Sequence, residues 1–139
     1  MTANLRLLDH VGFATSDLEA TRTFFSETLG ASVTEPITDT VQKVRICFAR
    51  FTGGTVELVA PAGENSPIDQ ALKKGGGCYH LCFATDDIEA TVERLRKDGC
   101  LPLNEPVPAP ALSGRRICFL FSREARLIEL VEAIHDEAK

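Results

Sequence analysis

The sequence lacks the features that mark several classes of protein. No apolar run approaches the ~20 residues that a helix needs to cross a bilayer, and no basic segment followed by an apolar one opens the chain. Fifteen Lys and Arg stand against twenty Asp and Glu, a net charge of −5 and a pI near 5.2, which is the wrong sign for binding the phosphates of nucleic acid. We therefore expect a cytoplasmic protein that binds neither a membrane nor nucleic acid.

Paired cysteine motifs are absent as well. The five cysteines are odd in number and none forms a Cys-x-x-Cys pair, which argues against a structural zinc set. Most of them lie in apolar segments, so we predict reduced thiols in a core. The composition, 44% hydrophobic and 25% charged over 139 residues, is that of one globular domain covering residues 1–139. The cysteines are Cys47, Cys78, Cys82, Cys100 and Cys118.

The chain repeats itself at an offset of about 70 residues. Residues 10–21, HVGFATSDLEAT, and residues 80–91, HLCFATDDIEAT, are identical at eight of twelve positions. Self-similarity in a conserved order indicates two copies of one structural unit. Two shorter matches follow in the same order: Arg45–Phe48 with Arg116–Phe119, and Val56–Val59 with Ile128–Val131.

Each copy predicts the same order of elements. An alternating apolar segment predicts a first strand, and apolar residues at helical spacing predict a helix after it. Ser16 and Asp86, each followed by a glutamate three residues later, predict the helix starts, and Gly30 and Gly99 predict the ends. Three strands complete each copy. The predicted core stripes of the helices are Leu18, Phe25 and Leu29, and Ile88, Val92 and Leu95.

These elements define the predicted architecture. We expect an α+β fold in which two βαβββ modules, about 7–61 and 78–132, form one domain. A short helix over 66–74 joins them, because Ser66 suits an N-cap, Pro67 suits the first turn and a glycine follows.

Each copy also places one histidine and one glutamate in an apolar strand: His10 and Glu57, then His80 and Glu129. Taken singly, each would be an ordinary core histidine or a solvent-facing glutamate. A buried carboxylate is costly unless a cation meets it, and the duplication of both residue types needs a shared reason. If the copies pair about a pseudo-twofold axis, two nitrogens and two oxygens converge. That donor set suits one divalent ion, Ni, Co, Mn, Zn or Fe.

With these motifs, the chain resembles the vicinal oxygen chelate superfamily over about residues 7–132. That superfamily includes glyoxalase I, methylmalonyl-CoA epimerase, extradiol dioxygenases and bleomycin-resistance proteins. The resemblance implies a cupped, mostly antiparallel sheet around a divalent metal held by His10, Glu57, His80 and Glu129. It also implies a homodimer, since twofold association would cover the open face of such a sheet.

The motifs are most similar to the methylmalonyl-CoA epimerase branch. Epimerases of that branch carry a second carboxylate base in a stretch like Glu-Gln-Gly-Val, where this chain has Val41-Gln42-Lys43-Val44. Val41 therefore stands at the base position, and we predict a substrate other than methylmalonyl-CoA. The motifs that carry the similarity are 9–12, 56–61, 64–68, 77–80 and 127–130.

A divalent ion in this setting predicts enolate chemistry. Such an ion stabilises the oxyanion that forms when a proton leaves the carbon beside a carbonyl. Reprotonation then gives epimerisation or isomerisation. We expect Glu129 as the first candidate for the base and Glu57 as the second. Arg45 and Arg116, which are equivalent in the repeat, could bind a substrate carboxylate or phosphate, or simply form a solvated cationic face.

Three classes of function fit this pattern. The first is a metal-dependent isomerase, epimerase or lyase acting on a small carbonyl or acyl-thioester substrate. The alternative is a small-molecule (antibiotic) binding or resistance protein, which usually has an aromatic-lined cleft, whereas this chain has no Trp and one Tyr. An oxygenase ranks third, because Glu57 fills the position that such enzymes leave open for oxygen. The third histidine, His135, lies in a polar tail and enters none of these predictions.

Overall fold

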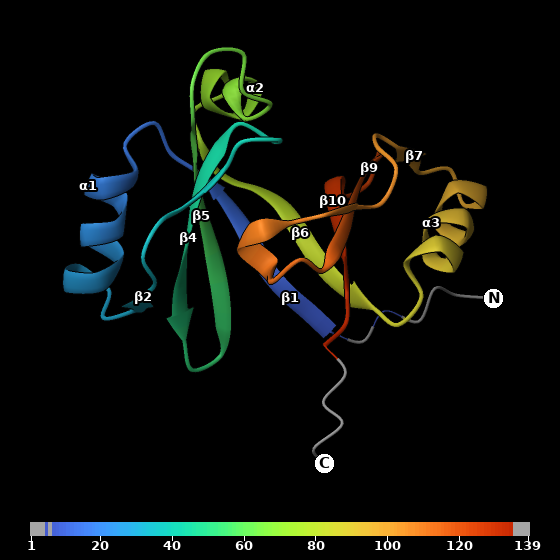
Figure 1. Cartoon of the computed structure of the whole chain (residues 1–139), viewed down its shortest axis with the longest axis horizontal. Helices are drawn as coiled ribbons and strands as arrows, with labels where there is room; N and C mark the ends of the chain where they lie inside the picture. Colours follow the sequence, from blue (N-terminus) through green and yellow to red (C-terminus); the bar gives the residue numbers. More distant parts are fainter. Residues whose placement is uncertain (1–4, 6, 135–139) are drawn as a thin grey trace. The chain divides into compact units, whose positions relative to one another are not determined.

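Both halves of the chain follow one order of elements in the computed structural model, which describes residue 5 and residues 7–134 (Figure 1). The first half has β1 (Leu7–Ala14), α1 (Leu18–Thr23), a π-helical turn (Phe24–Thr28), β2 (Ser32–Val33), β3 (Ile37–Asp39), β4 (Val44–Phe51) and β5 (Gly54–Pro61). The second has β6 (Gly77–Thr85), α3 (Ile88–Lys97), β7 (Leu101–Pro102), β8 (Val107–Pro108), a 3-10 turn (Pro110–Leu112), β9 (Arg116–Ser122) and β10 (Arg126–Glu132). Between them lies α2 (Asp69–Lys73), inside the predicted range of 66–74. The predicted α+β class is confirmed.

The chain forms two compact units. The first unit is residues 10–81, and the second is residues 82–134 with the described part of residues 1–9. Within the first unit the hydrogen-bonded strand order is β2-β4-β5-β1, and β3 also pairs with β4. Within the second the order is β10-β9-β7, and β8 pairs with β9. The β1–β5 pair is parallel and the other pairs inside each unit are antiparallel.

The short strand predicted after each helix is divided into two segments. At the break, the Thr34 hydroxyl accepts a hydrogen bond from the Phe48 backbone N–H at 2.8 Å. In the second copy the Asn104 side-chain oxygen accepts from the Phe119 N–H at 2.8 Å. A side chain thus replaces a backbone partner of the longer strand, two residues before a proline, which has no N–H to continue the ladder.

Each unit has its own hydrophobic core on the helix side of its strands. In the first unit Leu18 and Phe25 pack with alternate residues of β4 and β5, including Cys47 and Leu58. In the second unit the core comprises Ile88, Cys118, Leu120 and Leu130, with Val92 and Leu95 packed against it. Alternate strand residues point to opposite faces, so Glu57 and Glu129 lie on the face turned away from these cores.

One predicted core residue is wrong. Leu29 is 48% exposed, whereas its partners in the predicted stripe, Leu18 and Phe25, are buried. The helix passes into a π-helical turn at Phe24, and the extra residue in such a turn rotates every later side chain about the helix axis. Leu29 therefore leaves the face on which α-helical spacing would have placed it.

The cysteine prediction is confirmed for three of the five thiols. Cys47, Cys82 and Cys118 are buried, and burial raises the pKa of Cys47 to about 11 and also raises the pKa of Cys118. Cys100 is half-buried, and Cys78, near the start of β6, is exposed. All five are free thiols. Within the described residues no helix is both long and apolar enough to span a membrane.

The helices begin one residue later than predicted. The N-caps are Asp17 and Asp87, whose carboxylates each accept a hydrogen bond from the backbone N–H three residues on, at 3.0 Å. In a capping box a glutamate would accept from the N-cap N–H. Here the Thr15 and Thr85 hydroxyls do so instead, at 3.1 and 3.2 Å. An aspartate therefore caps each helix, and a threonine two residues earlier takes the part that a glutamate has in a capping box.

This correction predicts a difference between two neighbouring aspartates. Asp87→Ala should lower the free energy of unfolding by about 1 kcal/mol, because it removes the cap of α3. Asp86→Ala, at the exposed position that the sequence pattern favours, should change it by less than about 0.5 kcal/mol. Urea unfolding of both variants measures the difference, and equal losses would contradict the assignment of the cap.

Candidate metal centre

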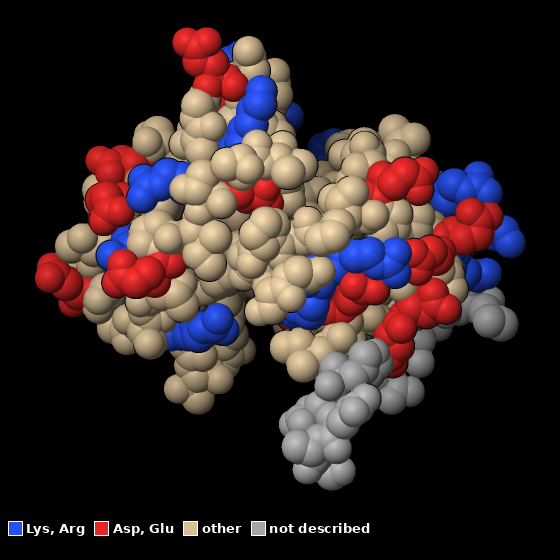
Figure 2. Space-filling model, in the orientation of Figure 1, with Lys and Arg blue, Asp and Glu red and all other residues tan. Residues whose placement is uncertain are grey.

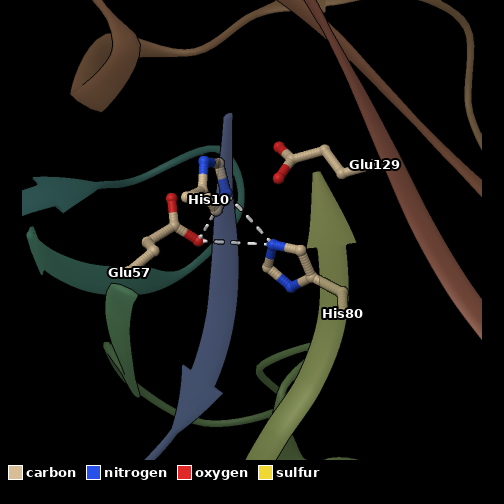
Figure 3. A group of neighbouring side chains, drawn as sticks. All are labelled: His10, Glu57, His80 and Glu129. Carbon is tan, nitrogen blue, oxygen red and sulfur yellow. Dashed lines mark hydrogen bonds and ion pairs between the residues drawn. The ribbon is translucent and has the colours of Figure 1, made fainter. Parts of the chain in front are cut away.

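Three buried polar side chains converge within the first unit (Figure 3). His10 Nε2 lies 3.2 Å from His80 Nε2, and Glu57 Oε1 lies 3.6 Å from each of these two nitrogens. The three residues are 1%, 3% and 4% exposed for His10, His80 and Glu57. Donor atoms of three of the four residues predicted as ligands therefore lie close together.

The strand register explains how these groups meet. The parallel pairing of β1 with β5 places Gly12 opposite Glu57, and His10 lies two residues before Gly12 on the same face. Leu58, next to Glu57, points the other way into the helix-side core. Glu57 is thereby turned toward His10. His80, on β6, completes the triangle (Figure 3).

Aromatic rings border the triangle. The Phe48 ring packs edge-on against His10, with centroids 6.0 Å apart, and Phe48 also pairs with Glu57 in the β4–β5 register. The Tyr79 ring lies 4.5 Å from the His80 ring. Sequence analysis assigned no role to these residues or to Gly12. A signal was available for Gly12, because glycine inside a strand often marks a close approach of another group.

The triangle fits a divalent metal ion. Its sides are 3.2, 3.6 and 3.6 Å, and the point equidistant from the three atoms lies about 2.0 Å from each, the length of a zinc bond to a His nitrogen or a carboxylate oxygen. A single proton between these atoms would bridge one pair, whereas a cation at the centre attracts all three lone pairs. Two imidazole nitrogens and one carboxylate suit the predicted ions Ni, Co, Mn, Zn and Fe.

Glu129 occupies the same place in the second unit that Glu57 has in the first. It is 2% exposed and pairs with Phe119 in the β9–β10 register, as Glu57 pairs with Phe48. Its neighbour Leu130 points into the helix-side core of that unit. The predicted burial of a carboxylate in an apolar strand is therefore found in both copies. Its role as the fourth ligand is part of the proposal below.

The two predicted substrate-binding arginines contact glutamates of their own units. Arg45 Nη2 lies 3.6 Å from Glu19 Oε1, and Arg116 Nη2 donates to Glu89 Oε1 at 3.0 Å and to Glu132 Oε2 at 2.9 Å. The bond to Arg116 lowers the pKa of Glu89 and raises that of Arg116. Figure 2 shows arginine and lysine side chains next to acidic ones. A substrate anion would therefore compete with these carboxylates. His135 lies outside the described residues.

Comparisons with known proteins identify the family. Residues 9–119 match the Glyoxalase/Bleomycin resistance protein/Dioxygenase superfamily. The chain belongs to this superfamily. A relative named ethylmalonyl-CoA/methylmalonyl-CoA epimerase, from Cereibacter sphaeroides, is 35% identical over 88% of this chain and 95% of its own length. The human mitochondrial methylmalonyl-CoA epimerase is 35% identical over 94% of this chain and 76% of its own length.

Solved structures agree with these relatives. The methylmalonyl-CoA epimerase of Streptomyces coelicolor, as a variant in complex with 2-nitronate-propionyl-CoA, has a TM-score of 0.81 at 30% identity, covering 95% of this chain and 100% of that one. The Mycobacterium tuberculosis epimerase has a TM-score of 0.80 at 29% identity, covering 94% and 90%. The predicted superfamily, its glyoxalase-like fold and an enzyme of the epimerase class are confirmed. A lyase reaction finds no support among these relatives.

Proposed function

We propose that this protein is a metal-dependent epimerase that removes the proton beside the carbonyl of an acyl-CoA thioester. The buried triangle of His10, Glu57 and His80 is the observation that supports the proposal most directly. A divalent ion bound there supplies Lewis-acid stabilisation of the negative charge that develops on the carbonyl oxygen. The epimerase names of the relatives supply the substrate class.

We assign different tasks to the two glutamates. Glu57 Oε1 lies equally close to both histidine nitrogens, so it belongs to the group that holds the metal. Glu129 contributes none of the three atoms of that triangle. We propose it as the fourth ligand and as the first candidate for the base. It is buried in an apolar strand, where a general base is shielded from bulk water. Glu57 is the second candidate.

Val41 makes the proton transfer one-sided in this proposal. It lies in the turn between β3 and β4, is 82% exposed and carries no group that can accept a proton. The buried Asp39 carboxylate accepts hydrogen bonds from the backbone N–H groups of Val41 and Gln42, at 3.0 and 2.9 Å, which holds the turn in place. Proton return on the face opposite Glu129 would then depend on water, so the predicted preference for a substrate other than methylmalonyl-CoA stands as part of the proposal.

Deuterium exchange tests this function. The metal-loaded protein in deuterium oxide should introduce deuterium beside the carbonyl of methylmalonyl-CoA or a related acyl-CoA faster than it inverts that carbon, and a chelator should stop both reactions. Mass spectrometry and chiral analysis follow the two rates. Val41→Glu should raise the ratio of inversion to exchange, whereas Val41→Gln, of similar size but not basic, should leave it unchanged.

The same experiment can overturn the proposal in two ways. Inversion of methylmalonyl-CoA by the unaltered protein at an ordinary enzyme rate, on the order of 10 per second or faster, would contradict one-sided transfer and the predicted change of substrate. Exchange that continues after chelation would contradict the metal-dependent mechanism. Arg45 and Arg116 stay predictions as substrate contacts, and their variants should raise KM if those contacts exist.

We also propose a homodimer, which the family resemblance implies. Large apolar side chains are exposed on short strands of both units, Leu101 at 61% on β7 and Ile37 at 41% on β3 among them. Association through such faces would remove this apolar surface from water. Analytical ultracentrifugation at micromolar concentration should give twice the 15.1 kDa chain mass. A sedimentation mass equal to one chain, unchanged by metal, would contradict the proposal.

A further inference from the structure

Gly12 lies next to two residues of the candidate metal site, Glu57 and His80, although it has no side chain to contribute. It follows His10 by two residues on β1, and its Cα pairs with that of Glu57 across the parallel register. It is buried within the strand, where glycine is disfavoured because it packs nothing and loses more conformational freedom than other residues. A glycine at this position therefore needs a specific reason.

The backbone conformation does not supply that reason. The turn and helix-end glycines of this chain, such as Gly30 and Gly99, have positive φ angles of 79° and 100°. Gly12 does not have a positive φ angle and lies in regular extended structure, which alanine adopts without strain. Its requirement must come from the space around it.

The imidazole of His80 fills that space. A Cβ atom on Gly12 would lie 2.1 Å from Cε1 and from Nδ1 of His80 and 2.7 Å from Nε2, whereas non-bonded carbon atoms approach to roughly 3.5 Å. The His80 ring is not a flexible end that can simply move aside. It is 3% exposed, packs against Tyr79, and keeps Nε2 at 3.2 Å from His10.

We infer that Gly12 is a positioning residue for the metal centre, because its lack of a side chain leaves the space that the His80 ring needs to reach His10 and Glu57. The inference rests on the metal site of the proposed function. Alanine at position 12 would keep the strand but push the ring out of the triangle, so one of three donors would be lost without any change to a ligand residue. The site thus depends on a fourth residue, Gly12 on β1, that binds nothing itself.

A double-mutant cycle tests this inference. Zinc affinity is measured by competition with a chromophoric chelator for the unaltered protein, Gly12→Ala, His80→Ala and the double variant. Gly12→Ala should lower the affinity by at least about tenfold, as for residues that orient metal ligands. Adding Gly12→Ala to His80→Ala should lower it by less than about twofold, because the ring is gone and the space is open. Gly53→Ala is the matched control, because a Cβ atom at position 53 would meet nothing within 4 Å. The zinc affinity of this variant should equal that of the unaltered protein.

The thermal midpoints of the four metal-free proteins provide a second measurement. If Gly12→Ala unfolds early or fails to fold, the double variant should regain stability, since removing the ring removes the clash. Two results would overturn the inference. The first is a zinc affinity of Gly12→Ala within twofold of that of the unaltered protein, and the second is an equal loss of zinc affinity from Gly12→Ala whether or not His80 is present. Failure of acyl-CoA exchange by a protein that binds zinc and shows the expected cycle would reject the proposed reaction alone.

Discussion

Replacing both histidines, as His10→Ala with His80→Ala, should lower the affinity for a divalent ion by several orders of magnitude. The two substitutions remove both nitrogen donors of the candidate site, and the carboxylates that remain hold such an ion far more weakly than the full set. The unaltered protein, loaded with Ni, Co, Mn or Zn and dialysed, should retain about one equivalent per chain. Elemental analysis and calorimetric titration measure both quantities.

The same substitution should remove the stabilisation that the ion provides. A ligand that binds only the folded state at about 100 times its Kd stabilises that state by about 2.7 kcal/mol, so metal should raise the thermal midpoint of the unaltered protein and not that of the double variant. Cys78→Ser, at an exposed position two residues before His80 on the same strand, is the control and should bind metal normally. Undiminished metal binding by the double-histidine variant would contradict the assigned site.

Replacing Glu129 should separate proton transfer from metal binding. Glu129→Gln should slow exchange of the proton beside the carbonyl by about 10²- to 10⁴-fold, the usual contribution of a general base. Most of the metal should remain, because the first unit still offers His10, Glu57 and His80. Glu57→Gln should instead lose metal and exchange together. Metal content and deuterium incorporation measured on the same samples distinguish the two patterns.

A matched control comes from the same hairpin. Glu124 is an exposed glutamate in the turn between β9 and β10, so Glu124→Gln carries the same chemical change on the same hairpin and should leave metal and exchange unaffected. Full exchange in Glu129→Gln with metal still bound would reject Glu129 as the base and leave Glu57 as the candidate. Exchange that survives both Glu129→Gln and chelation would reject the mechanism itself.

The repeat and the strand pattern were enough to predict the fold class and the burial of the four site residues. A repeat at a nearly constant offset places equivalent residues at equivalent points of two copies. The burial of a histidine and a glutamate in each copy could therefore be predicted from the apolar strand pattern around them. Strand alternation, with a period of two residues, is a local property that the sequence carries directly. The same holds for the glycines that end both helices.

Which residues share a hydrogen-bond partner or compete for the same space became clear from the folded chain and not from the sequence pattern. Asp17 and Asp87 are the helix caps, and each donates its backbone N–H to a threonine hydroxyl two residues earlier. Glu89, the predicted partner of one cap, is bound to Arg116 on another strand. Gly12 shows the same limit most clearly. No local preference explains it, because the atoms that exclude a side chain there belong to His80, 68 positions later in the chain. Contacts between residues so distant in sequence arise from packing, which local propensity and spacing do not encode.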